Sequence, residues 1–208
     1  LTFRVIELLG KLETGEASER EKAALRLYTP LMKLTTGKQG VAVTSEALEC
    51  FGGAGYVEDT GLPRLLRDAQ VLSIWEGTTN VLSLDALRAI AKEGALAPFL
   101  AELGDAASDP HPELAQAAAR AVAAGEHAAT WLTETMARAP HEIERGARRF
   151  ALTLGRAAEL ALLVRHATWS AQHEGDRRSL LAALRFAQHG VDLIDEHMPE
   201  HRALAMDE

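Results

Sequence analysis

The 208-residue chain has little of several things that would place it in common protein classes. It contains one cysteine, Cys50, which excludes an internal disulfide framework and favours a reducing compartment. Aromatic residues make up only 5% of the chain, so the core must be built mainly from leucine, alanine and valine. No run approaches the roughly 20 apolar residues that a membrane-spanning helix requires. With no signal-peptide pattern at its start, we expect a cytoplasmic protein without a membrane partner.

The chain also has a deficit of positive charge. Lysine and arginine number 22 against 30 aspartate and glutamate residues, a formal net charge of −8. This balance keeps a protein soluble but disfavours nonspecific attraction to nucleic acid or to an anionic membrane. The chain starts at Leu1 within an apolar periodic stretch. We therefore expect that residues upstream of it are missing.

Apolar residues recur at helical spacing along the first half of the chain. Pro30 and the pair Gly37 and Gly40 are expected to kink or interrupt the longest of these patterns. The glycines after residue 50 should end it, because glycine reaches backbone angles closed to other residues. The expected helices span residues 3–12, 19–50 and 62–73, with a fourth that is capped by Thr78 or Thr79 and runs to about residue 92.

The composition shifts to a linker-like sequence over residues 105–112. Three alanine-rich helical patterns follow, at residues 113–137, 141–172 and 177–194, and would form an antiparallel bundle. No strand signal is present. We therefore predict an all-α fold, with a first helical domain at residues 1–93 and a smaller helical extension at residues 94–208.

Residues 51–80 combine a glycine-dense turn, a short basic helix and the sequence Ile-Trp-Glu-Gly-Thr-Thr-Asn. The carboxylate of Glu76 lies between a large indole and the start of a helix. Apolar surroundings raise the proton affinity of such a group, and the helix N-terminus lowers it. A base that removes a weakly acidic C–H proton must be kept from water in this way. The alternative is structural, with Glu76 capping the helix or pairing with Arg64 or Arg67.

Three motifs in this region resemble, in order and spacing, the signature of the acyl-CoA dehydrogenase flavoproteins. They are Glu49-Cys50-Phe51-Gly52-Gly53-Ala54-Gly55-Tyr56, Leu65-Leu66-Arg67-Asp68-Ala69 and Ile74-Trp75-Glu76-Gly77-Thr78-Thr79-Asn80. The resemblance covers roughly residues 1–90 and implies the family's helical C-terminal domain. It also implies a reaction: FAD accepts a hydride from the β-carbon of an acyl-CoA while Glu76 takes the α-proton. The flavin supplies the redox chemistry, and the protein supplies orientation and electrostatics.

The resemblance further assigns the neighbouring positions. It implies flavin-side contacts for Gly52, Gly53, Glu49, Thr78 and Asn80, and a substrate-side wall from Trp75 and Gly77. Two of these positions depart from the family pattern, because many relatives carry glutamine where this chain has Glu49 and Asn80, and a carboxylate near a diphosphate would repel it. Counterparts of the family's N-terminal helical and central β-domains are absent from the chain, so we expect the chain by itself to be inactive. The family assembles as dimers or tetramers, so we expect a homo-oligomer.

Within the family, the sequence after Glu76 and the extra helical region resemble the AidB-like branch. That branch is associated with FAD, weak dehydrogenase activity and DNA binding, which gives an alternative function as a DNA-binding or interaction flavoprotein. Residues 91–208 contain 12 lysines and arginines against 18 acidic residues, which disfavours a phosphate-tracking surface. A local basic group is the exception and could form a basic patch; it consists of Arg145, Arg148, Arg149, Arg156, Arg177 and Arg178. Alternatively, these arginines form a solvated face and pair with Glu142, Glu144 and Asp176.

The remaining chemistry-bearing residues give weaker signals. His197 and His201 have a helical ligand spacing, but Pro199 lies between them and no third ligand follows, so we predict no metal. Trp131 and Trp169 are expected to anchor the core of the extension, unless one of them is exposed and marks a partner surface. Cys50 is expected to be a small buried apolar residue.

Overall fold

In the computed structural model, which describes residues 1–195, every regular element is helical. The predicted all-α fold is therefore confirmed for these residues. None of the described helices is long and apolar enough to cross a membrane. The α-helices are α1 (Thr2–Glu13), α2 (Glu19–Glu49), α3 (Leu62–Val71), α4 (Thr79–Glu93), α5 (Leu96–Ala107), α6 (Ala115–Arg138), α7 (Ile143–His173) and α8 (Arg178–Ala187). Short 3₁₀ turns lie at Gly52–Gly55, Glu58–Thr60, Pro112–Leu114 and Pro140–Glu142.

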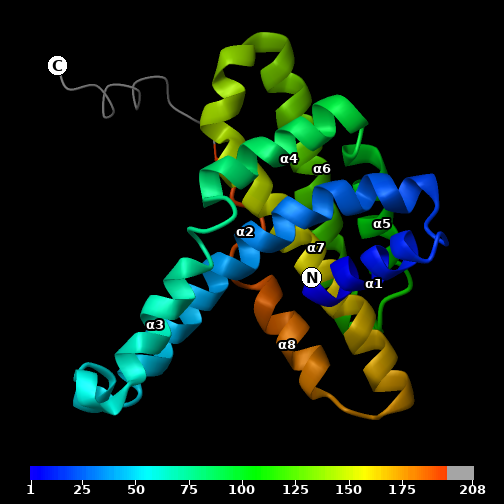
Figure 1. The fold of residues 1–208 in the computed structure, drawn as a ribbon. Helices are drawn as coiled ribbons and strands as arrows, with labels where there is room; N and C mark the ends of the chain where they lie inside the picture. The colour runs from blue at the N-terminus through cyan, green and yellow to red at the C-terminus, as the bar shows by residue number, and fades with distance from the viewer. Residues whose placement is uncertain (196–208) are drawn as a thin grey trace.

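Two helices of 31 residues each, α2 and α7, organise the fold. Helix α2 packs on α1, α3, α4, α5 and α7, and helix α7 packs on α4, α5, α6 and α8. The C-terminal half of α2 leaves this body and pairs with α3 to form a hairpin that projects from the molecule (Figure 1). The hairpin ends in the glycine turn, so the chemistry-bearing segment lies away from the main core.

Helix α2 begins with a reciprocal cap. The hydroxyl group of Ser18 accepts a hydrogen bond from the backbone N–H of Glu21 at 3.2 Å, and the carboxylate of Glu21 accepts one from the N–H of Ser18 at 2.9 Å. The expected interruption at Pro30 and at the Gly37/Gly40 pair is wrong, because α2 continues through all three positions. Proline removes one backbone donor, and the buried packing of Pro30 and its neighbours on the other helices retains the helix.

One helix was missed by the sequence pattern. Residues 96–107 form α5, with Pro98 in its first turn, where a missing N–H leaves no partner unsatisfied. The non-helical segment that follows therefore begins at Ser108, later than the expected start of the linker at residue 105. Helix α8 ends at Ala187, although the apolar pattern extended to residue 194. In both cases the spacing of apolar residues indicates a helical face but does not determine at which residue the helix begins or ends.

The hydrophobic core is continuous between the two halves of the chain. Leu27 and Tyr28 of α2 belong to the same buried cluster as Phe99 of α5 and Phe150 of α7, and the rings of Tyr28 and Phe99 lie 4.8 Å apart. Helix α4 also packs directly on α7. The division into residues 1–93 and 94–208 stays a prediction, and the two parts share this core.

Two predictions of buried residues are wrong. Cys50 is exposed, because it caps α2 at the tip of the projecting hairpin, beyond the reach of the other helices. Trp169 is 47% exposed, and its ring stacks between His166 at 6.1 Å and His173 at 5.2 Å on one face of α7. Trp131 is partly buried and packs against Phe150 with ring centroids 5.5 Å apart, as expected for a core anchor. His197 and His201 lie outside the described residues.

Candidate functional site

The hairpin turn requires glycine at a specific position. Gly55 is buried, and a Cβ atom on it would lie 2.2 Å from the carbonyl oxygen of Leu48, closer than any side chain tolerates. Gly52 has a positive φ of 54°, and a Cβ atom on Gly52 or Gly53 would meet nothing within 4 Å. The turn therefore packs tightly on α2 at one end and presents open backbone at the other.

The open end of the turn offers unused donors. The backbone N–H groups of Gly52 and Gly53 donate to no other described residue. Successive free N–H groups in a turn form the kind of concavity that binds phosphate oxygens. The exposed carboxylate of Glu49 belongs to the last residue of α2, three residues before Gly52. Its negative charge opposes the attraction of those donors for an anion.

The arginines of the motif are engaged elsewhere. Arg67 donates two hydrogen bonds to the carboxylate of Glu58, at 2.8 and 2.9 Å, and thereby holds the pKa of Glu58 below its usual range. Arg64 pairs with Asp68 at 3.4 Å. The alternative in which Glu76 pairs with Arg64 or Arg67 is therefore wrong.

Glu76 itself occupies an unusual backbone conformation. Its φ is 53°, in the left-handed region that non-glycine residues rarely adopt, and its exposed side chain makes no hydrogen bond or ion pair with the described residues. Gly77 follows with a φ of 116°, and a Cβ atom there would lie 3.0 Å from the side chain of Leu82. The left-handed conformation of a non-glycine residue such as Glu76 costs about 1–3 kcal/mol, and residues of this kind cluster at functional sites.

The described residues do not form the dry pocket that the sequence predicts around this carboxylate. Trp75 is 52% exposed and Glu76 is exposed. The physical reason is their place on the turn between α3 and α4, outside the body of packed helices. Any exclusion of water from Glu76 must therefore come from surface that these helices do not supply.

Lys33 is a site residue that sequence reasoning missed. Its ammonium group donates to the backbone carbonyl of Leu72 at 2.5 Å and to that of Trp75 at 3.0 Å, and so ties the turn before Glu76 to α2. Gly37 lies one turn further along α2, and a Cβ atom on it would be 3.0 Å from the carbonyl oxygen of Leu72. A lone lysine in a long helix carries no sequence signal for this role.

The start of α4 leaves its polar side chains free. Thr78 occupies the N-cap position, as predicted, but its side chain makes no capping hydrogen bond, and Thr79 is buried. The side chain of Asn80 is exposed and makes no hydrogen bond with the described residues. The hydroxyl group of Thr78 and the amide of Asn80 are thus available to an external ligand.

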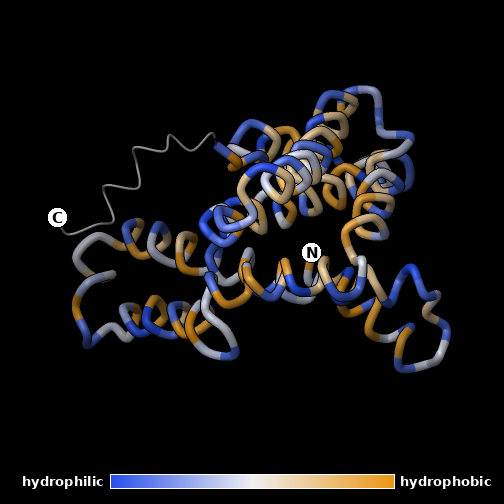
Figure 2. Tube along the Cα trace, turned by 90° about the horizontal axis from the view of Figure 1, so that it is seen from above, coloured by the Kyte–Doolittle hydropathy of each residue, from blue (hydrophilic) through white to orange (hydrophobic). Residues whose placement is uncertain are grey.

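The hairpin also exposes large apolar side chains. Tyr56 is 85% exposed and Ile74 is 62% exposed, and the hydrophobic stretches of the hairpin lie away from the body of the molecule (Figure 2). Further exposed apolar residues of the hairpin are Phe51, Val57, Leu65, Val71 and Leu72. In soluble proteins, exposed apolar patches are often interaction sites.

The basic group of the extension is largely neutralised. Arg145 pairs with Glu142 at 2.6 Å, Arg178 with Asp176 at 2.7 Å and Arg177 with Glu113 at 2.9 Å. Arg149 pairs with Asp195 at 3.7 Å, and Arg156 donates to the backbone carbonyls of His189 and Gly190. The pairs with Glu142 and Asp176 agree with the pairing alternative, whereas Glu113 and Asp195 take part in place of the expected Glu144. This arrangement gives no support to a DNA-binding face. The described residues hold no cluster of three or more histidine, cysteine, aspartate or glutamate side chains suited to a metal ion.

Comparisons with known proteins relate both parts of the chain to one family. Residues 7–91 match the family "Acyl-CoA dehydrogenase, C-terminal domain", and residues 99–203 match "Acyl-CoA dehydrogenase 11 C-terminal domain-like". Acyl-CoA dehydrogenase family member 11 of Caenorhabditis elegans is 60% identical over 100 residues, which are 48% of this chain and 16% of that protein. The putative acyl-CoA dehydrogenase AidB of Escherichia coli is 42% identical over 86 residues, 41% of this chain and 16% of that protein.

A solved structure extends the likeness to both halves. The crystal structure of Caenorhabditis elegans ACDH-11 in complex with C11-CoA superposes with a TM-score of 0.84 and 38% identity, over 98% of this chain and 35% of that one. The chain thus spans about a third of that protein. The AidB-like branch is supported in part, since both AidB and family member 11 are relatives. The chain belongs to the acyl-CoA dehydrogenase family and is the C-terminal helical part of such a protein.

Proposed function

We propose that this chain forms part of an FAD-dependent oxidoreductase that introduces a double bond between the α- and β-carbons of an acyl-CoA. The observation that carries the proposal is Glu76. Its carboxylate is unpaired although arginines lie nearby in the sequence, and it sits on a strained turn that Lys33 fixes to α2. A non-glycine residue held in the left-handed region lowers stability, and such residues cluster at functional sites.

In this proposal Glu76 is the base and Trp75 and Gly77 line the substrate side. The carboxylate takes the proton from the α-carbon while the hydride leaves the β-carbon, so the substrate loses two electrons and two hydrogens. A carboxylate is a strong enough base only when it is desolvated. The half-exposed indole of Trp75 offers an apolar wall that a covering surface would complete. The acyl-CoA would therefore be held between this turn and that surface.

The residues present fit a flavin nucleotide. The free N–H groups of Gly52 and Gly53 suit the phosphate-bearing part, and the unengaged side chains of Thr78 and Asn80 suit polar groups of the cofactor. When bound, FAD supplies the hydride acceptor. Glu49 faces the same region in this proposal and weakens the attraction for phosphate by its charge. The exposed apolar side chains of the hairpin would be covered in a homo-oligomer, and we place the protein in the cytoplasm.

The proposal is tested by Glu76→Gln in the full-length protein, with Glu46→Gln, at an exposed position on α2, as the matched control. Glu76→Gln should leave FAD bound but reduce the rate of flavin bleaching by acyl-CoA by about 10²–10⁴-fold, because the general base is lost. Glu46→Gln should bleach at the parent rate. Unchanged bleaching in Glu76→Gln would reject the assignment.

A further inference from the structure

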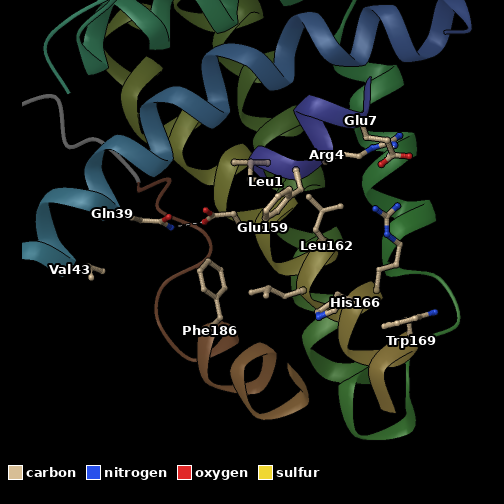
Figure 3. A pocket seen from close by; sticks show the side chains of 13 residues that line it. Leu1, Arg4, Glu7, Gln39, Val43, Glu159, Leu162, His166, Trp169 and Phe186 are labelled. Carbon is tan, nitrogen blue, oxygen red and sulfur yellow. Dashed lines mark hydrogen bonds and ion pairs between the residues drawn. The ribbon is translucent and has the colours of Figure 1, made fainter. Parts of the chain in front are cut away.

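A cavity lies away from the Glu76 turn. It has a volume of about 1080 Å³ and is lined by residues of α1, α2, α7 and α8, none of which belongs to the segment from residue 51 to residue 80 (Figure 3). A volume of this size is at the upper end of small-molecule sites. The cleft is therefore large enough for a ligand unrelated to the turn.

The walls of the cleft are mainly apolar and are held in place. Leu162 and Leu163 come from α7, Val43 from α2 and Phe186 from α8. The guanidinium group of Arg156 lies 4.8 Å from the centre of the Phe186 ring and donates to the backbone carbonyls at residues 189 and 190, at 2.5 and 2.6 Å. This contact fixes the end of α8 against α7, so the wall is part of the folded structure.

A buried carboxyl group faces the cleft. Glu159 of α7 is 9% exposed and accepts a hydrogen bond from the side-chain amide of Gln39 on α2 at 2.8 Å (Figure 3). Its second oxygen makes no hydrogen bond with the described residues. Burial raises the pKa of Glu159, and the hydrogen bond from Gln39 lowers it. The carboxyl group is thus a poorly solvated acceptor with spare capacity.

No cation of the described residues makes an ion pair with this carboxyl group, although the charge of Arg156 lowers its pKa. Arg4 is engaged by Glu7 at 2.8 Å and by Glu102 at 2.6 Å. Arg165 and His166 also line the cleft, and among the described residues neither makes an ion pair with Glu159.

We propose that the cleft binds an apolar molecule that carries a protonated amino group, with the ammonium on the free oxygen of Glu159 and the apolar part between Leu162 and Phe186. A hydrocarbon or an anion in the same place would strip water from Glu159 without giving it a partner, which is unfavourable. An ammonium group supplies both charge and donors. The apolar part is stabilised by removal of its surface from water.

The test compares three ligands of equal chain length, octylammonium, octanol and octanoate, by calorimetry and by the fluorescence of Trp169, whose ring lines the cleft. Octylammonium should bind saturably and at least about tenfold more tightly than either of the others, which corresponds to a modest ion-pair contribution. Glu159→Gln should reduce that preference to less than about threefold. Glu126→Gln, an exposed acidic position on α6, should leave it unchanged.

Variants at the exposed edge of the cleft provide a second test that leaves the hydrogen bond between Gln39 and Glu159 unchanged. Val43 is 68% exposed, so Val43→Arg and Val43→Glu should both fold. The arginine should weaken octylammonium binding and the glutamate should strengthen it. The proposal would be overturned if octanoate bound as tightly as octylammonium, or if Glu159→Gln kept the preference for octylammonium. It would also be overturned if the affinity for octylammonium did not change with the charge at position 43.

Discussion

The ammonium group of Lys33 donates a hydrogen bond to the backbone carbonyl of Trp75 across 42 residues of sequence, at 3.0 Å. A second bond to the carbonyl of Leu72 means that one side chain holds both ends of the turn before Glu76. The position of the proposed base therefore depends on a helix distant in sequence.

Lys33→Ala should loosen this turn. Loss of the two hydrogen bonds should lower the free energy of unfolding by about 1 kcal/mol and should increase hydrogen exchange at the amides of Ile74 to Gly77. Lys38→Ala, at an exposed position on the same helix, serves as the control and should change neither. Equal exchange in the two variants would show that Lys33 does not position the turn.

Gly37 and Gly40 should respond differently to alanine. Alanine in a helix is favoured over glycine by about 1 kcal/mol, and at Gly40 the new Cβ atom would make an ordinary contact of 3.7 Å with Leu72. At Gly37 it would lie 3.0 Å from the carbonyl oxygen of Leu72. Urea unfolding should therefore show Gly40→Ala to be the more stable variant by at least about 1 kcal/mol. The reverse order would contradict the close approach.

Gly155 should be intolerant of a side chain because of one hydroxyl group. A Cβ atom on Gly155 would lie 2.2 Å from the Oγ1 atom of Thr35, which is buried and has no hydrogen-bond partner in the described residues. Gly155→Ala should lower the free energy of unfolding by about 1–3 kcal/mol. Thr35→Ala in the same chain should restore most of this loss, since the next contact is 3.4 Å.

The matched control for that pair is Gly104→Ala on α5, where a Cβ atom meets nothing within 4 Å. It should increase stability by about 1 kcal/mol through helix propensity alone. A double-mutant cycle over Thr35 and Gly155 with no coupling would show that α2 and α7 do not cross at this distance.

Glu159 should make stability fall as the pH rises. Burial raises its pKa above the ordinary value of 4.5, so the folded state holds the proton more tightly than the unfolded state. Its contribution is fully present below pH 4.5 and is lost as the pH passes through the raised pKa. Denaturant unfolding over this range should show a smaller decline for Glu159→Gln than for the parent. Parallel profiles would contradict the burial of the carboxyl group.

Asp85 should act in the opposite direction. Arg26 donates to both oxygens of its carboxylate at 2.9 Å, and this pairing lowers the pKa below the ordinary value of 3.8. The stabilisation is present above pH 3.8 and is lost as the pH falls through the lowered pKa. Asp85→Asn should therefore show less acid destabilisation than the parent in thermal unfolding. Asp68→Asn, whose 3.4 Å pair is exposed, should behave like the parent.

The sequence predicted the parts of the fold that depend on neighbouring residues. The spacing of leucine and alanine residues predicted the helices α1 to α4 and α6 to α8. The glycine turn and the Glu76 box were recognisable because their residues are contiguous. Helix α5 was not predicted, and the sequence left open whether Trp169 is buried or exposed, since periodicity does not say which helix covers which face.

By itself, the sequence determined an all-α chain and the identity of its one conspicuous carboxylate. Only the tertiary structure decided that Glu76 has no arginine partner, that Lys33 anchors its turn and that Gln39 meets Glu159 at the edge of a cleft. Lys33 and Trp75 are 42 positions apart in the sequence, and Gln39 and Glu159 are 120 positions apart. Helix propensity is set within a few residues, whereas such contacts arise when distant helices pack together to bury apolar surface.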